Sequence, residues 1–111
     1  MEWGRTTTLT GSSGRQYEFN VFERETRFRP KPGIYVMGRQ RENAANPNEL
    51  SFCFVGESAN LQKRPFNPDK QACFASFGVS LIFLLEEFDE TRRREIVQDL
   101  VSAYAPRCNT I

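Results

Sequence analysis

The sequence contains no histidine and only three cysteines among its 111 residues. The lack of histidine excludes every nucleophile that depends on a Ser-His or Cys-His pair. A zinc site would have to rely on the cysteines, which include no C-x-x-C pair. They are Cys53, Cys73 and Cys108. We expect three unpaired thiols, a pattern that favours a reducing compartment.

Long hydrophobic runs are also missing. The segment Met1–Gly14 is polar and rich in Thr, Ser and Gly, without the apolar core of a secretion signal. The longest apolar run, Val79–Leu85, is interrupted by Ser80 and is too short to cross a bilayer. These absences predict a cytoplasmic protein that has no membrane partner.

The chain has little excess charge of either sign, with 15 basic and 14 acidic residues. Strong nucleic-acid binders usually carry a basic excess, so the net charge of +1 does not identify a partner. The distribution is less even. Arg24, Arg27, Arg29 and Lys31 alternate with acidic and aromatic residues, and Arg92–Arg94 open the last predicted helix. Solvated faces are the favoured interpretation of both runs.

Periodicity predicts one domain over residues 15–111, preceded by a flexible segment, 1–14. The length suits a single core. Residues 17–21 alternate with a period of two, which is typical of a half-buried strand. Three further strands are predicted at 33–37, 51–55 and 79–85, and the second and third of the four are expected to pair antiparallel.

Capping residues predict the helices. Ser58 is suited to cap a turn over 59–64, which Pro65 ends. A second helix begins at Pro68 and stops before Gly78. The last begins at Asp89 and ends before Pro106. The expected fold is α+β, a small mostly antiparallel or mixed sheet of three to four strands flanked by about three helices.

Two short strings combine a glycine with an aromatic residue. They are Gly33–Tyr35 and Phe54–Gly56, and the second continues through Asn60-Leu61 to Lys63-Arg64. This pattern resembles the GIY-YIG nuclease superfamily. The C-terminal part is similar to that family's final helix and its Pro-x-x-Asn tail, here Pro106 to Asn109. The segment 12–19 also resembles a subgroup of small stand-alone bacterial members with an added N-terminal strand.

The resemblance implies a metal-dependent hydrolysis of phosphodiesters. In the family a sheet presents two tyrosines and an arginine, and a helix supplies a glutamate that holds a divalent ion. Tyr35 matches the first tyrosine and Arg64 the arginine, while Gly33 and Gly56 match the motif glycines. Phe54 stands at the second tyrosine and lacks its hydroxyl. Plain core packing is the alternative role for Tyr35 and Phe54.

Val97 occupies the position of the metal-binding glutamate. Glu95 and Asp99 lie about 200° around the helix from it and cannot substitute. With valine at this position, a magnesium ion would lack its carboxylate ligand from the protein. We therefore expect a catalytic centre that is disabled and holds no metal. Mg²⁺ or Mn²⁺ would be needed only if Asp69 or Glu57 replaced the missing ligand.

Three functions follow as hypotheses. The first is a pseudo-nuclease that binds DNA weakly through basic side chains, for which the candidates are Lys63, Arg64, Arg93 and Arg94. The second is an active endonuclease with a relocated metal ligand. The third is an interaction module for an unidentified protein partner. The resemblance also implies that Tyr35, Phe54, Arg64 and Val97 converge around one shallow concave surface of the sheet.

Overall fold

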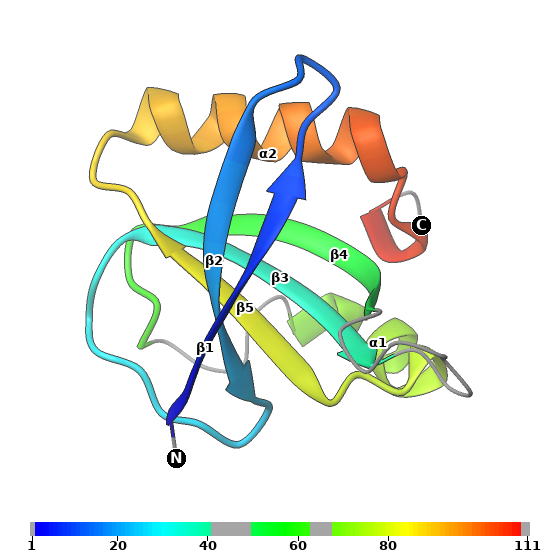
Figure 1. The fold of residues 1–111 in the computed structure, drawn as a ribbon. Coiled ribbons are helices and arrows are strands. Elements are labelled where there is room, and N and C mark those ends of the chain that lie inside the picture. Colours follow the sequence, from blue (N-terminus) through cyan, green and yellow to red (C-terminus); the bar gives the residue numbers. More distant parts are fainter. Residues whose placement is uncertain (1, 41–49, 63–67, 110–111) are drawn as a thin grey trace.

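The structure is a computed structural model that describes residues 2–40, 50–62 and 68–109 (Figure 1). It contains one antiparallel sheet with a helix packed against each face (Figure 1). The strands are β1 (Glu2–Thr10), β2 (Gln16–Glu23), β3 (Gly33–Gln40), β4 (Leu50–Ser58) and β5 (Leu81–Glu86). The helices are α1 (Gln71–Phe77) and α2 (Glu90–Tyr104), with two 3₁₀ turns, η1 (Pro68–Lys70) and η2 (Arg107–Asn109).

The α+β class is confirmed, but the counts of elements differ from those expected. The described residues form five strands in the order β1-β2-β5-β3-β4, with every pair antiparallel, and two α-helices. The additional strand is β1, within the segment 1–14 that we expected to be flexible. Its Thr-rich composition resembles a loop, yet β-branched threonine favours extended backbone.

Each face of the sheet carries its own cluster of buried side chains. On β3, Ile34 and Val36 face α2, whereas Tyr35 and Met37 belong to the cluster that packs with α1 and η2. We call these the α2 face and the α1 face. The alternation follows from the period of two in a strand.

Most of the predicted helix ends are correct. Asp89 caps α2, since its Oδ1 accepts a hydrogen bond from the N–H of Thr91 at 3.0 Å. Gly78 ends α1 with φ of 85°, a left-handed conformation that favours glycine. The helix expected over 59–64 is not formed in its described part. Ser58 and Asn60 instead hold a turn through side-chain hydrogen bonds to nearby backbone groups.

Two of the three cysteines are paired, contrary to our expectation. Cys73 in α1 and Cys108 in η2 form a disulfide, while Cys53 is a free and buried thiol. The partners are 35 residues apart, and only the packing of α1 and η2 on the same face brings them together. The pairing removes the basis for predicting a reducing compartment, and the cytoplasmic location stays a prediction. None of the described helices is both long and apolar enough to span a membrane.

The C-terminal turn also covers an edge of the sheet. The side-chain amide of Asn109 forms two hydrogen bonds with β4. Its oxygen accepts from the Val55 N–H and its nitrogen donates to the Val55 carbonyl, each at 2.9 Å. Because β4 is an edge strand, these backbone groups would otherwise lack a strand partner. The Pro-x-x-Asn tail therefore has a structural role here.

The β1–β2 turn is attached to α2 by one carboxylate. Asp99 accepts hydrogen bonds at 2.7 Å from the hydroxyls of Ser13 and Tyr17, at 2.8 Å from the N–H of Ser13 and at 3.2 Å from the Ser12 hydroxyl. The Ser13 hydroxyl, followed by that of Tyr17, lowers the pKa of Asp99 from 3.8 to about 2. This carboxylate anchors the N-terminal hairpin.

We expect this anchor to weaken in acid. Because the pKa of Asp99 is lower in the folded than in the unfolded protein, its ionised carboxylate stabilises the fold above pH 3.8. This stabilisation is lost as the pH falls through about 2. The difference in Tm between wild type and Asp99→Asn should therefore be largest near neutral pH and should shrink below about pH 4. Glu95→Gln on the same helix is the control. A difference that does not change with pH would show that Asp99 is not the titrating anchor.

Candidate functional site

Tyr35 and Phe54 are brought together but lie inside the core. Their ring centroids are 6.0 Å apart with planes at 27°, and the residues are 3% and 7% exposed. Gly56 is the register partner of Tyr35 across β3 and β4. A Cβ at Gly56 would lie 2.6 Å from the Tyr35 hydroxyl oxygen, so the glycine makes room for the ring. A Cβ at Gly33 would likewise clash with the Leu85 carbonyl oxygen. In this structure both glycines have packing roles.

Val97 does not join this pair. It is half-buried on α2 and packs against the cluster on the α2 face, on the other side of the sheet from the Tyr35 and Phe54 rings. Lys63 and Arg64 lie outside the described residues. Of the four positions that the resemblance singled out, the structure therefore brings together Tyr35 and Phe54 and separates Val97 from both.

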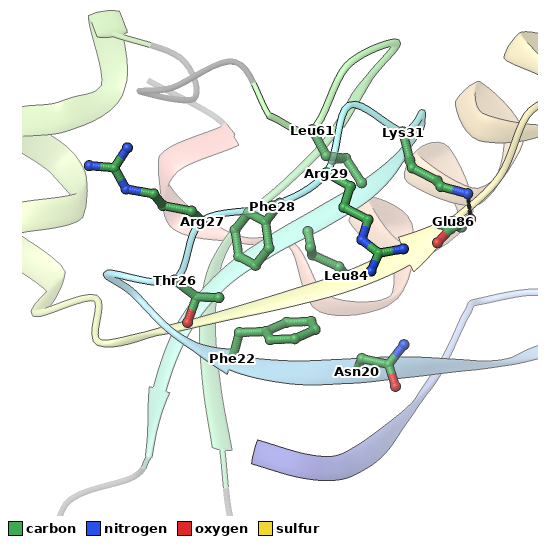
Figure 2. A pocket seen from close by; sticks show the side chains of 10 residues that line it. All are labelled: Asn20, Phe22, Thr26, Arg27, Phe28, Arg29, Lys31, Leu61, Leu84 and Glu86. Carbon is green, nitrogen blue, oxygen red and sulfur yellow. Dashed lines mark ion pairs between the residues drawn. The ribbon is translucent and has the colours of Figure 1, made fainter. Parts of the chain in front are cut away.

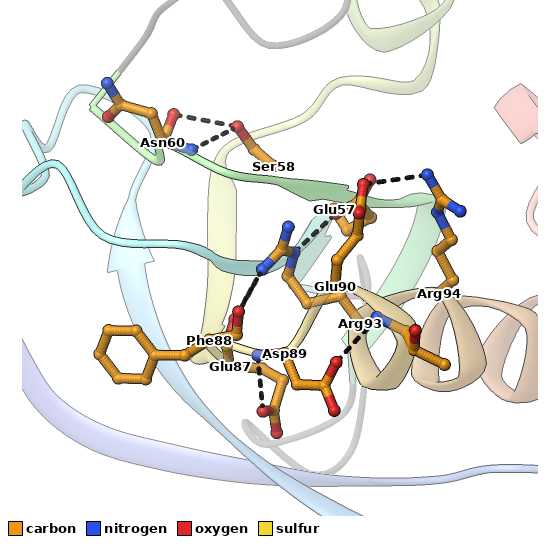
Figure 3. A network of polar contacts seen from close by, with 10 residues as sticks. Glu57, Ser58, Asn60, Glu87, Phe88, Asp89, Glu90, Arg93 and Arg94 are labelled. Atoms are coloured by element: carbon orange, nitrogen blue, oxygen red, sulfur yellow. Dashed lines mark hydrogen bonds and ion pairs between the residues drawn. The ribbon is translucent and has the colours of Figure 1, made fainter.

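Arg93, a candidate for phosphate contact, is 5% exposed and is bound within the protein (Figure 3). Its Nε donates to Glu57 at 2.7 Å, and Nη1 donates to the carbonyls of Glu87 and Phe88 at 3.2 and 3.0 Å. The guanidinium thus joins the end of β4 to the start of α2. Arg94 is exposed and pairs with Glu90 at 2.9 Å.

The described residues do not fit a divalent ion at the position where the resemblance implies one. Val97 offers no oxygen, and the Glu57 carboxylate, one candidate for a relocated ligand, is held by Arg93. The other candidate, Asp69, is exposed in η1. Among the described residues, no three His, Cys, Asp or Glu side chains are grouped as they would be around a metal ion.

A groove on the α1 face is the best candidate for a ligand site (Figure 2). It has a volume of about 530 Å³ and lies between β2, β5 and the segment 24–32. Its floor is apolar and its rim is polar. The floor consists of Phe22, Phe28, Leu61 and Leu84, and the rim includes Asn20, Arg27, Arg29, Lys31 and Glu86.

Backbone hydrogen bonds hold the segment that forms one wall of the groove. At the start of this segment, the Arg24 N–H donates a hydrogen bond to the Ser80 carbonyl at 3.0 Å. Near its end, the Lys31 carbonyl accepts from the Leu61 N–H at 2.8 Å, and the Pro32 carbonyl accepts from Glu87. The wall is therefore formed before any ligand binds, which lowers the entropy lost on binding.

The rim of the groove carries an excess of positive charge. Arg27 and Arg29 are exposed, and neither forms an ion pair with another residue in the part of the chain that the structure describes. Lys31 lies 4.0 Å from Glu86, a long pair between half-exposed side chains that contributes little. Three cations thus oppose one carboxylate. An anion is the ligand that this rim favours.

The sequence contained the residues of this groove without indicating the site. Arg27, Arg29 and Lys31 belong to a mixed charge run that we interpreted as a solvated face. In β2, Asn20 and Phe22 lie on the other face of the strand from the buried residues Tyr17, Phe19 and Val21. An aromatic residue on that second face was the signal in the sequence that could have pointed to the groove.

Comparisons of the chain with protein-family models, with curated proteins and with solved structures found no match.

Proposed function

We propose that this chain is a GIY-YIG-like domain that binds nucleic acid through the groove and does not cleave it. The observation that carries the proposal is the placement of Arg27 and Arg29, exposed on the rim without ion pairs to other described residues. Phosphate groups neutralise such side chains, and aromatic rings beside them are typical of nucleic-acid binding surfaces. The resemblance to a nuclease superfamily favours nucleic acid over other polyanions.

The lack of cleavage rests on separate features. The mechanism that the resemblance implies uses a carboxylate that holds a metal ion, together with two tyrosines and an arginine. Val97 supplies no carboxylate, Phe54 supplies no hydroxyl, and Tyr35 is buried. An endonuclease that uses Glu57 as the relocated ligand is disfavoured, because the Glu57 carboxylate is already engaged by Arg93.

Binding to a protein partner is the second candidate function. Phe88, in the connection between β5 and α2, is 69% exposed, the highest exposure among the large apolar side chains that the structure describes (Figure 3). Exposed aromatic side chains are frequent anchors of protein interfaces. Salt dependence separates the two candidates, since only phosphate contacts release counterions from a nucleic acid.

We expect the binding of a labelled 12-nucleotide strand to depend on salt through the groove. Three phosphate contacts predict a slope of log Kobs against log [NaCl] of about −2, at about −0.7 per contact. Arg27→Gln/Arg29→Gln should reduce the slope to about −0.7 and weaken binding between about tenfold and a hundredfold. Fluorescence anisotropy over a range of salt concentrations measures both.

Arg92→Gln/Arg94→Gln is the matched control. It removes the same charge from α2, on the other face of the sheet, and should leave the slope unchanged. Equal losses in the two double variants would indicate an effect of net charge alone and would contradict binding at the groove.

A further inference from the structure

The floor of the groove lies below its charged rim and is aromatic. Phe22 and Phe28 meet edge to face, with centroids 5.2 Å apart and planes at 71° (Figure 2). Both rings are half-buried, and Leu61 and Leu84 extend the apolar surface with 2% and 8% exposure. A surface that contacts phosphates alone needs no such floor. The ligand should therefore present a flat apolar group as well as negative charge.

The dimensions also suit a nucleoside. The volume of about 530 Å³ lies within the range of roughly 300 to 1,000 Å³ that small ligands occupy. Arg29 and Lys31 stand on the rim, and Arg29 extends beside Leu84 toward Asn20 in Figure 2, whereas the Arg27 guanidinium points outward from the same segment. A base on the floor would leave its phosphates level with these side chains.

We infer that the groove binds an unpaired base of a single-stranded nucleic acid, a conclusion that rests on the proposed function. The bases of a duplex are paired and stacked, so a duplex reaches the rim and leaves the floor empty. An unpaired base has a free π-face that packs on aromatic side chains whatever its identity. Asn20 stands at the groove with an amide that suits the polar edge of a base.

Three probes of equal phosphate number test this inference: a 12-nucleotide single strand, the same strand with abasic sites throughout, and a short duplex. Fluorescence anisotropy at one low salt concentration gives their affinities. We expect the single strand to bind about tenfold or more tightly than the other two. Equal affinity for the intact and abasic strands, or preference for the duplex, would overturn the inference that the groove binds an unpaired base. Either result would leave the proposed function intact. Failure of all three probes to bind would overturn the proposed function.

Two ring variants locate the base. Phe28→Leu should bring the affinity of the intact strand close to that of the abasic strand and leave the salt slope unchanged. Phe88→Leu removes the exposed ring outside the groove and should preserve the preference. Loss of the preference in Phe88→Leu, with retention in Phe28→Leu, would place the base elsewhere and contradict the inference. Because Phe28 contributes to packing, a thermal melt of each variant confirms folding before binding is compared.

Discussion

Removal of the disulfide in a Cys73→Ala/Cys108→Ala variant should lower the free energy of unfolding by about 4 kcal/mol. The bond closes a loop between residues 35 apart, and the chain-entropy model gives this magnitude for a loop of that length. Cys108 is fully buried beside Asn109, so its release also weakens the two hydrogen bonds that cover the β4 edge. Urea denaturation followed by circular dichroism measures the loss.

Dithiothreitol provides the control for this experiment. It should destabilise wild type to about the level of the double variant and should not affect the double variant. The remaining thiol, Cys53, does not compete for exchange, because burial raises its pKa to about 11. Wild type that is equally stable with and without reductant would mean that Cys73 and Cys108 are not bonded.

Arg93→Ala is expected to destabilise the protein by about 3 kcal/mol, at the low end of the range for breaking a buried ion pair. The change leaves the Glu57 carboxylate, 29% exposed as a side chain, without its 2.7 Å partner. It also removes the donor to the carbonyls of Glu87 and Phe88. Unsatisfied groups of this kind account for most of the cost.

A double-mutant cycle separates the pair from the loss of packing. Arg93→Met/Glu57→Met should recover part of the stability, because neither charge then remains alone. Arg94→Ala removes an exposed pair and should change stability by less than about 1 kcal/mol. Similar losses for Arg93→Ala and Arg94→Ala would show that Arg93 is not part of a buried network.

The sequence predicted the elements whose signals are local. The period of two located β2, β3 and β4, and the capping chemistry of Asp89 located the start of α2. Strand β1 was missed because threonine, serine and glycine are shared by loops and edge strands. The disulfide was missed because its partners meet only through tertiary packing.

The candidate site was harder to predict than the fold. The period of two in a strand separates Tyr35 from Ile34, but it does not say which helix covers which face. The expectation that Val97 lies near Tyr35 required α2 to cover the same face of the sheet as the Tyr35 ring, and α2 covers the other face. The groove depends on the return of segment 24–32 over β2 and β5, which no local pattern encodes.

Binding without cleavage is tested most directly by one end-labelled single strand incubated with protein and Mg²⁺ or Mn²⁺. A native gel reports binding, and a denaturing gel of the same samples reports cleavage. Wild type and Arg92→Gln/Arg94→Gln should retard the strand, Arg27→Gln/Arg29→Gln should not, and every strand should keep its full length. Retardation by the groove variant equal to that of wild type, or metal-dependent shortening of the strand by wild type, would contradict the proposal.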